Sequence, residues 1–370
     1  MDRTRRVAVT VEQCWHQVPG GTATSVLGLL GALRRRPDVE LLGVSARHRQ
    51  PAPEPFRPPL EVHQLPLPRL ALYEAWHALR WPPVERATGP VDVVHVTAVA
   101  VPPTRAPLVV TIHDLAFLAD PTQATRHGNR FFRRGLELAR RHARLVLVPS
   151  EATAGECRGA GFDPASIRVI PWGVDAGAAA AVVVDEARLI HGLTRPYVLF
   201  VGTVEPRKNL AGVIGAMATL AGREVDLVLV GPTGWNEDLD ARLAQLDGTA
   251  IAVHRLGFQP LDALPALYAG CAAFCFPSLR EGFGLPVLEA MAHGAPVVTS
   301  RGTATAEVAG DAALLVDPRD HVAIGTALAN LLDDPSLAED LRARGRRRAR
   351  TYTWDRTAEL TAAAYAEAAP

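Results

Sequence analysis

The sequence predicts an α/β protein made of two doubly wound domains in tandem, each with a parallel sheet and helices on both faces. Its 370 residues exceed the roughly 250 to 300 at which a single hydrophobic core stops growing. Short β-rich apolar runs alternate with helical patterns along almost the whole chain, and this alternation occurs twice. Apolar residues make up 48% and charged residues 21%, as in soluble globular proteins.

The first half contains six runs that are typical of buried parallel strands. They span residues 6–11, 40–44, 91–96, 108–112, 145–148 and 167–170. The glycine pair Gly20-Gly21 opens a helical run over residues 22–35. The Pro-rich segment 51–68 cannot form a central strand or a helix interior, so we expect a surface excursion there.

The second half repeats the pattern with six further runs. They span residues 197–201, 226–230, 251–256, 272–276, 296–299 and 313–316. A stretch of Ala and Val without a clear pattern follows the turn-like Pro171-Trp172-Gly173 and separates the two series of strands. We therefore expect a first domain over 1–172, a linker over 173–195, a second domain over 196–351 and a helix over 352–370. The pattern leaves open which domain that helix packs on.

Charge and cysteine usage exclude several classes of protein. Lys plus Arg and Asp plus Glu number 39 each, so the whole chain has no electrostatic preference for nucleic acid or an anionic membrane. The four cysteines lack zinc or redox spacing, which favours free thiols in a reducing cytosol. Without a signal-peptide pattern or a run of 18 apolar residues, we expect a cytoplasmic protein.

The strongest chemical pattern follows the run 272–276. Pro286 suits the first position of a helix, and the amides of Phe283, Gly284 and Leu285 would then point off its positive end. Such an end can hold phosphate oxygens or sugar hydroxyls. Glu281 precedes the helix and Glu289 lies about one turn inside it. The alternative, that both acids merely favour a helix N-terminus, explains Glu289 poorly.

Arg207 and Lys208 follow the run 197–201, at the start of a helix expected from about Asn209. Two cations at that position oppose the helix dipole, which an anionic ligand would explain better than two solvated charges. Lys208 is the only lysine among the 39 basic residues. This exception to the arginine bias favours a functional role.

The first domain has no G-x-G-x-x-G after its first strand, which excludes a nicotinamide-type fingerprint. Gly20-Gly21 indicates either an anion site or a plain loop-to-helix turn. His113 comes directly after the run 108–112, where ligands of parallel sheets bind. Four arginines at helical spacing form either a solvated face or a contact with an anionic acceptor or membrane: Arg130, Arg134, Arg141 and Arg144.

These motifs together resemble the family-four retaining glycosyltransferases of the GT-B fold, and the resemblance spans nearly the whole chain. Its most specific element is the E-x(7)-E pattern from Glu281 to Glu289, followed by Ala-Met-Ala-His-Gly. The resemblance implies two Rossmann-like domains that face each other across a cleft.

The resemblance also implies a role for each candidate residue. Glu289 would bind the donor ribose, and Glu281 with the backbone of Gly282, Phe283, Gly284 and Leu285 would hold the transferred sugar. Arg207 and Lys208 would neutralise the diphosphate, His113 would contact the donor sugar, Gly20 and Gly21 would close over the phosphate, and Phe258 and Gln259 would pack on the base. Thr203 departs from an arginine common in the family, and Trp172 from an asparagine.

The expected activity is retaining, metal-independent transfer of a hexose from a GDP- or UDP-sugar to a glycan, lipid or natural-product acceptor. We expect no cofactor, no nucleic-acid partner and, through the four arginines, a peripheral place at the inner membrane face. The alternatives are a non-catalytic nucleotide-sugar-binding subunit and an epimerase or phosphorylase of the same fold. A pyridoxal-dependent phosphorylase needs a Schiff-base lysine, and Lys208 already belongs to the phosphate loop.

Overall fold

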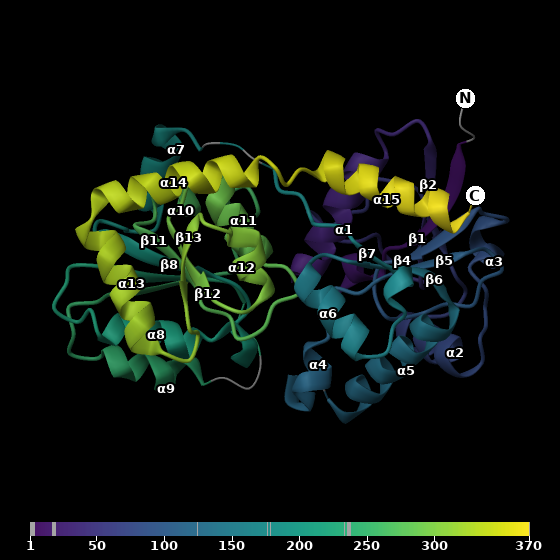
Figure 1. Cartoon of the computed structure of the whole chain (residues 1–370), viewed down its shortest axis with the longest axis horizontal. Helices are drawn as coiled ribbons and strands as arrows, with labels where there is room; N and C mark the ends of the chain where they lie inside the picture. The colour runs from purple at the N-terminus through teal and green to yellow at the C-terminus, as the bar shows by residue number, and fades with distance from the viewer. Residues whose placement is uncertain are drawn as a thin grey trace. The chain divides into compact units, whose positions relative to one another are not determined.

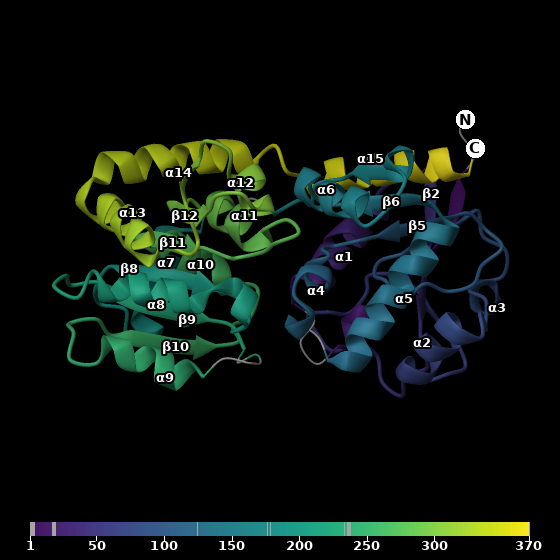
Figure 2. The ribbon, with the colours of Figure 1, turned by 60° about the horizontal axis from the view of Figure 1, so that its bottom comes forward.

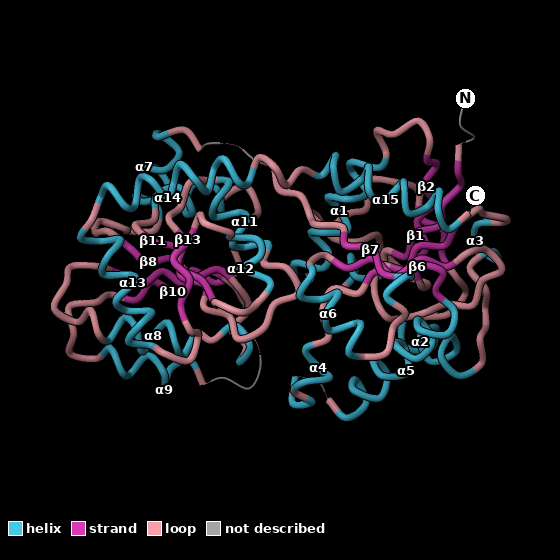
Figure 3. The backbone as a smooth tube through the Cα atoms, in the orientation of Figure 1, coloured by secondary structure: helices cyan, strands magenta, loops and turns pink. Residues whose placement is uncertain are grey.

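The computed structural model describes residues 4–16, 20–123, 125–175, 177, 179–232, 234 and 238–369. The chain divides into two compact units, one made of residues 1–173 and 353–370 and the other of residues 174–352 (Figure 1). Each unit has its own parallel sheet, which Figure 3 shows in magenta. The expectation of two Rossmann-like folds is confirmed.

The first sheet has the strand order β3-β2-β1-β4-β5-β6-β7, and its neighbouring strands run parallel. The strands are β1 (Arg5–Thr10), β2 (Val39–Ser45), β3 (Val62–Gln64), β4 (Val93–Val96), β5 (Leu108–Thr111), β6 (Ala143–Val148) and β7 (Ile167–Val169). All six runs expected in this half are strands. The prediction for residues 51–68 was incomplete, because this segment contributes the edge strand β3, which is too short to give an alternating pattern.

Helices cover both faces of the first sheet. They are α1 (Gly20–Leu33), α2 (Arg69–Ala78), α3 (Glu85–Thr88), α4 (Ala116–Ala119), α5 (Arg126–His142), α6 (Glu151–Gly159) and α15 (Trp354–Ala368), with 3-10 turns at Glu12–Trp15, Pro121–Gln123 and Pro164–Ser166. Helices α1 and α15 pack together on one face, and α2 contacts α5 on the other (Figure 2).

Helix α15 belongs to the first unit although residues 174–352 precede it in the chain. Two glycines allow its close approach. A Cβ on Gly28 of α1 would lie 2.3 Å from the indole of Trp354, and one on Gly173 would lie 2.2 Å from the Trp354 backbone nitrogen. Neither position tolerates a side chain without displacing α15.

The second sheet has the order β10-β9-β8-β11-β12-β13 and is also parallel. Its strands are β8 (Tyr197–Val201), β9 (Asp226–Val230), β10 (Val253–Gly257), β11 (Ala273–Phe276), β12 (Val297–Ser300) and β13 (Ala313–Val316). Its helices are α7 (Ala181–Ile190), α8 (Leu210–Ala218), α9 (Leu239–Leu243), α10 (Leu264–Gly270), α11 (Leu285–Ala292), α12 (Ala304–Ala309), α13 (His321–Asp333) and α14 (Pro335–Ala349), with 3-10 turns at Pro206–Lys208 and Ala244–Leu246. All six expected runs are strands.

The segment expected to be a linker is instead part of the second unit. Residues 174–195 belong to it, and helix α7 packs against α10. Ala176 and Ala178 lie outside the described residues. The turn at Pro171 indicated the boundary, but the run of Ala and Val that follows is the start of a packed helix.

Both cores are built from strands with every residue buried, as in β4, β5, β11 and β12. This is the pattern expected of parallel strands with helices on both faces. The four cysteines are buried and unpaired. Within the described ranges, no helix has the length and apolar character needed to cross a lipid bilayer.

Candidate active site

In the second unit, the strand order reverses between β8 and β11, which are hydrogen-bonded neighbours. Ligands of doubly wound sheets bind beyond the carboxyl ends of such a strand pair. The loop after β8 carries Arg207 and Lys208, and the loop after β11 carries Glu281. The topology therefore brings together the two motifs that the sequence analysis treated separately.

Backbone hydrogen bonds hold these two loops against each other. The Leu279 amide and the Ser278 hydroxyl both donate to the Arg207 carbonyl, at 2.8 Å each. The Asn209 side chain donates to the Pro277 carbonyl at 2.9 Å. Asn209 has a φ of 58°, in the left-handed region that asparagine tolerates better than most residues, and it caps helix α8. The side chains on the loops are thus fixed relative to each other.

A buried cluster of two cations and two carboxylates results. The Lys208 ammonium lies 2.5 Å from Glu281 Oε1, and Arg207 Nη1 lies 3.4 Å from the same oxygen. Arg207 Nη2 pairs with Glu205 Oε1 at 2.7 Å. The Ser278 hydroxyl is a further 2.9 Å donor to Glu281 Oε1. Only 10% of the Lys208 side chain and 8% of the Glu281 side chain are exposed, so water screens this pair weakly.

The cluster keeps Glu281 ionised. Burial favours the neutral acid, but the charges of Lys208 and Arg207 outweigh it and lower the pKa of Glu281 below its ordinary value. Burial, and then the charge of Arg207, lower the pKa of the Lys208 ammonium. Since the protein contacts all use Oε1, Glu281 Oε2 has no protein donor in the described part of the chain. That oxygen is free to accept from a ligand.

Helix α11 begins at Leu285, so Pro286 is its second residue rather than its first. Its cap, Gly284, has a φ of 111°, and a Cβ there would lie 2.8 Å from the Thr305 methyl group. Among the described residues, no acceptor faces the amides of Phe283, Gly284 and Leu285. These three donors lie at a positive helix end, and that they hold phosphate oxygens or sugar hydroxyls stays a prediction.

Glu289 lies inside α11 and is largely buried. The Tyr268 hydroxyl donates to its Oε2 at 2.9 Å, and burial raises the pKa of the carboxyl above its ordinary value. Its Oε1 has no partner among the described residues. Glu281 and Glu289 therefore share one arrangement, in which the protein holds one carboxylate oxygen and the other has no partner among the described residues.

The remaining second-unit candidates lie around this cluster at the carboxyl edge. Thr203 follows β8 and is half-buried. Phe258 follows β10 and is 56% exposed, while the Gln259 side chain donates to the Leu256 carbonyl at 2.7 Å. An exposed aromatic ring at this edge is available to pack on a planar base. The roles assigned to these three residues stay predictions.

In the first unit, His113 follows β5 at the carboxyl edge of the sheet. Its Nε2 lies 2.8 Å from the Thr97 carbonyl, so this nitrogen carries a hydrogen and Nδ1 is left as the acceptor. Burial lowers the pKa of His113, which favours the neutral ring. Trp172, the second departure from the family pattern, packs against it at 5.6 Å between ring centroids. Gly20 and Gly21 are exposed at the start of α1.

Two family models match the chain. The model described as Glycosyltransferase Family 4 matches residues 19–177, and that described as Glycosyl transferases group 1 matches residues 185–348. An O-antigen chain mannosyltransferase B of Escherichia coli is 32% identical over 265 residues, which cover 70% of this chain and 69% of the relative. The chain belongs to glycosyltransferase family 4.

Other relatives of this glycosyltransferase carry different names. A D-inositol 3-phosphate glycosyltransferase of Actinosynnema mirum is 33% identical over 71% of this chain and 67% of its own length. An MMP alpha-(1->4)-mannosyltransferase of Mycolicibacterium hassiacum is 33% identical over 62% of this chain and 56% of its own length. The chain is therefore a sugar-transferring enzyme, and the relatives' names do not agree on an acceptor.

Solved structures show the same fold at low identity. Anabaena Alr3699/HepE in complex with UDP and glucose matches with a TM-score of 0.76 and 19% identity, over 98% of this chain and all of its own. WaaG, a glycosyltransferase of lipopolysaccharide biosynthesis, matches with a TM-score of 0.73 and 18% identity, over 96% of this chain and 98% of its own. The fold of this glycosyltransferase is GT-B.

Two further residues contribute to the site of this glycosyltransferase and were not predicted from its sequence. Glu205 holds the Arg207 guanidinium and is 3% exposed, and Tyr268 holds Glu289. A signal for Glu205 was present, since a carboxylate stands two residues before a cation pair. Tyr268 gave no such signal, because it lies in a different helix and only the fold brings it to Glu289.

The arginine-rich stretches of this glycosyltransferase differ in their use. Of the four arginines predicted at helical spacing, Arg130, Arg134 and Arg141 lie on α5, but Arg144 lies in β6, so its helical placement was wrong. Arg134 and Arg141 pair with Glu137, whereas Arg130 is exposed. On α14, Arg342 donates to the carbonyls of Gly294 and Cys271, which follow the ends of α11 and α10. Arg342 therefore stabilises the ends of two helices, a role that sequence alone could not separate from a solvated face.

Proposed function

We propose that this protein is a retaining, metal-independent hexosyltransferase that uses a GDP- or UDP-sugar as donor. The observation that carries the proposal is the site at the β8 and β11 loops. One loop carries the buried Lys208 and the half-buried Arg207, and the other leads into three backbone amides that face no described acceptor. A diphosphate is the ligand chemistry that needs both. The mannosyltransferase names among the relatives support a mannosyl donor.

Donor binding would use groups that the fold leaves unsatisfied. The diphosphate would accept from the α11 amides and from the cationic groups of Arg207 and Lys208. Glu281 Oε2 would accept from the transferred hexose and Glu289 Oε1 from the ribose. Phe258 would pack on the base. With the hexose at Glu281 and the diphosphate at the two cations, the bond between the anomeric carbon and the β-phosphate oxygen would lie between these groups.

Charge stabilisation would supply most of the rate enhancement. As the anomeric carbon separates from the β-phosphate oxygen, negative charge grows on the diphosphate, where the cations and helix end are already oriented. No ordering of solvent is then needed in the transition state. These protein charges are our reason to propose metal independence.

We propose retention without an enzymic nucleophile. Glu281 is held by Lys208, Arg207 and Ser278, which makes it a hydroxyl acceptor rather than a free nucleophile. The acceptor oxygen would bond to the anomeric carbon on the face that the phosphate leaves, and its proton would pass to the departing phosphate oxygen. His113, neutral and anchored to Thr97, keeps the proposed role of a contact to the donor sugar.

We also propose a peripheral contact with an anionic surface at the inner membrane face, through helix α5. Its exposed cations other than the pair held by Glu137 include Arg126, Arg130, Arg133 and Arg140. A row of cations near an anionic bilayer contributes roughly 1 kcal/mol each. Flotation with phosphatidylglycerol vesicles, compared with phosphatidylcholine vesicles, tests this. Equal flotation would contradict it.

The donor proposal is tested by thermal stabilisation with a panel of nucleotide sugars. A ligand at 100 times its dissociation constant should add roughly 2.7 kcal/mol. Proton NMR of the product then gives the anomeric configuration, and activity after chelation and gel filtration tests metal independence. No stabilisation by any nucleoside-diphosphate sugar, an inverted product or loss of activity after chelation would each overturn its part.

A further inference from the structure

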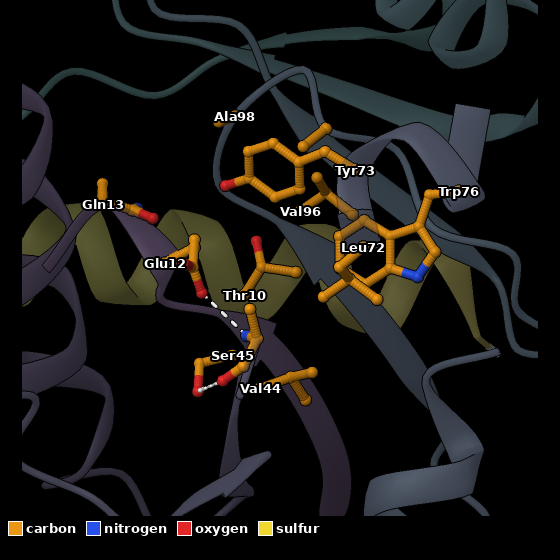
Figure 4. A pocket seen from close by; sticks show the side chains of 12 residues that line it. Thr10, Glu12, Gln13, Val44, Ser45, Leu72, Tyr73, Trp76, Val96 and Ala98 are labelled. Carbon is orange, nitrogen blue, oxygen red and sulfur yellow. Dashed lines mark hydrogen bonds between the residues drawn. The ribbon is translucent and has the colours of Figure 1, made fainter. Parts of the chain in front are cut away.

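A small cavity lies in the first unit, where the strand order of the sheet reverses between β1 and β4. It is lined by the carboxyl ends of β1, β2 and β4, by the residues that follow them, and by helix α2 (Figure 4). The donor proposal uses none of these residues. Since the carboxyl edge at such a reversal is where doubly wound sheets bind ligands, the cavity is a candidate subsite.

A buried carboxylate forms one wall. Glu12 has a side chain that is only 5% exposed. Its Oε2 accepts from the Ala46 amide at 2.8 Å, and its Oε1 lies 2.9 Å from His48 Nε2. The His48 ring is stacked on Trp15 at 4.5 Å. Glu12 is thus held in one position before any ligand arrives, which lowers the entropic cost of binding.

Two neutral groups complete the polar wall. The Gln13 amide nitrogen donates to Thr97 Oγ1 at 2.7 Å, which leaves its oxygen as an acceptor. The Tyr73 hydroxyl has no partner among the described residues, and burial followed by the Glu12 charge raises its pKa, so it stays a donor. Figure 4 shows the Tyr73 hydroxyl and the Gln13 oxygen pointing toward the space beside Glu12.

Size and charge restrict what can enter. The cavity has room for about one water molecule, so a hydroxyl or hydroxymethyl group fits and a sugar ring does not. Glu12 is the only charged residue among those that line it. The charge of Arg69, which does not line the cavity, acts to lower the pKa of the Tyr73 hydroxyl, against the larger effect of burial. A phosphate would meet the Glu12 charge, whereas a sugar hydroxyl would donate to it.

We infer that this cavity is an acceptor subsite that receives a hydroxyl or hydroxymethyl group of an uncharged sugar and disfavours phosphorylated acceptors. The entering hydroxyl donates its single hydrogen to Glu12 or to Gln13, and Tyr73 donates to its oxygen. The inference rests on the proposed function, because it assigns the acceptor of that reaction.

The test compares binding of methyl α-mannopyranoside and mannose 6-phosphate by saturation-transfer NMR. We expect the native protein to bind the uncharged sugar at least about tenfold more tightly than the phosphate ester. Tyr73→Phe should weaken binding of the uncharged sugar about tenfold, the loss expected for one hydrogen bond. Glu12→Gln should reduce the preference over the phosphate ester, because it removes the repelling charge.

Glu85→Gln is the matched control. Glu85 accepts from two backbone amides in the same unit but at residues 105 and 106, ahead of β5 and away from the carboxyl edge. It should leave the preference unchanged. If Glu12→Gln does not fold, Tyr73→Phe still tests the inference, because it removes only the hydroxyl oxygen that faces the cavity.

Three results would overturn the inference: tighter or equal binding of the phosphate ester, sugar binding that neither Tyr73→Phe nor Glu12→Gln alters, and no binding of either sugar at tens of millimolar. UDP and GDP are titrated on the same samples. If the protein binds a nucleotide but neither sugar, the acceptor subsite is contradicted and the donor proposal stands. A sugar response without nucleotide binding removes the donor proposal alone.

Discussion

Removal of the Lys208 charge gives the sharpest test of the proposed site, because that ammonium has two separable functions. In the protein alone it neutralises the buried Glu281 carboxylate at 2.5 Å. In the reaction it would stabilise the departing diphosphate. Lys208→Met keeps much of the aliphatic stem and deletes the ammonium, with its charge, its hydrogen bonds and its contact to the Phe276 ring, whose centroid lies 4.8 Å from Nζ.

Both losses have an expected size. Breaking a buried ion pair by removing one partner costs about 3 to 5 kcal/mol of folding stability, and the remaining Arg207 contact to Glu281 at 3.4 Å should keep it near the lower value. Removing one preorganised charge partner of a transition state costs roughly 3 to 4 kcal/mol, about a hundred- to thousandfold in turnover. Urea unfolding measures the first and steady-state transfer the second.

The double variant Lys208→Met with Glu281→Gln separates the two effects. Removing both charges should restore most of the stability, since no uncompensated buried charge remains, but turnover should stay low. Arg223→Met is the control, because Arg223 pairs with Asp333 on the exposed surface of the same unit and should alter neither property. Near-native turnover of Lys208→Met, or full recovery of turnover in the double variant, would refute the catalytic role.

Four further predictions concern other parts of the molecule. Glu289→Gln should weaken donor affinity by roughly 1.5 to 3 kcal/mol with little change in turnover, as measured by nucleotide titration and initial rates. His113→Ala should lower kcat more than donor affinity, and unchanged kcat would remove it from the site. His95 is buried, and burial lowers its pKa from 6.5 to about 3, so the folded state binds its proton only in strong acid. The contribution of neutral His95 to the free energy of unfolding is therefore fully present above pH 6.5 and is lost as pH falls toward 3, by roughly 1.4 kcal/mol per pH unit. Urea unfolding between pH 7 and 3 should show that the unfolding free energy of His95→Gln falls less steeply with pH than that of the native protein. Gly28→Val should destabilise the first unit by more than the roughly 1 kcal/mol of an average substitution, because its side chain would enter the Trp354 ring, and an unchanged thermal midpoint would show that α15 packs elsewhere.

Twelve strands were predictable from the sequence because they are short β-rich runs, and the central ones, such as β4, β5, β11 and β12, are apolar and buried throughout. The edge strand β3 was not, since Val62–Gln64 has only three residues and is half-exposed. Helix α7 was mistaken for a linker because none of its residues is fully buried, so its pattern lacks an apolar face.

The sequence was enough to predict which loops carry the site residues, but not which of those residues contact one another. Local sequence showed that Arg207 and Lys208 oppose a helix dipole, and it showed the acid at Glu281. Only the neighbouring positions of β8 and β11 show that these charges hold one another. Tertiary contacts between distant segments, such as Tyr268 with Glu289, leave no local trace in either segment.

The return of helix α15 to the first sheet bears on the order in which the chain can fold. A ribosome releases residues 1–173 while the segment that covers part of that sheet has not yet been made, because residues 174–352 are translated in between. The second unit is continuous in sequence, so it can complete its core first, while the nascent first unit keeps an apolar surface around Gly28 uncovered. A deletion variant that lacks residues 174–352 and joins residue 173 to residue 353 would make the first unit contiguous and allow it to be expressed by itself.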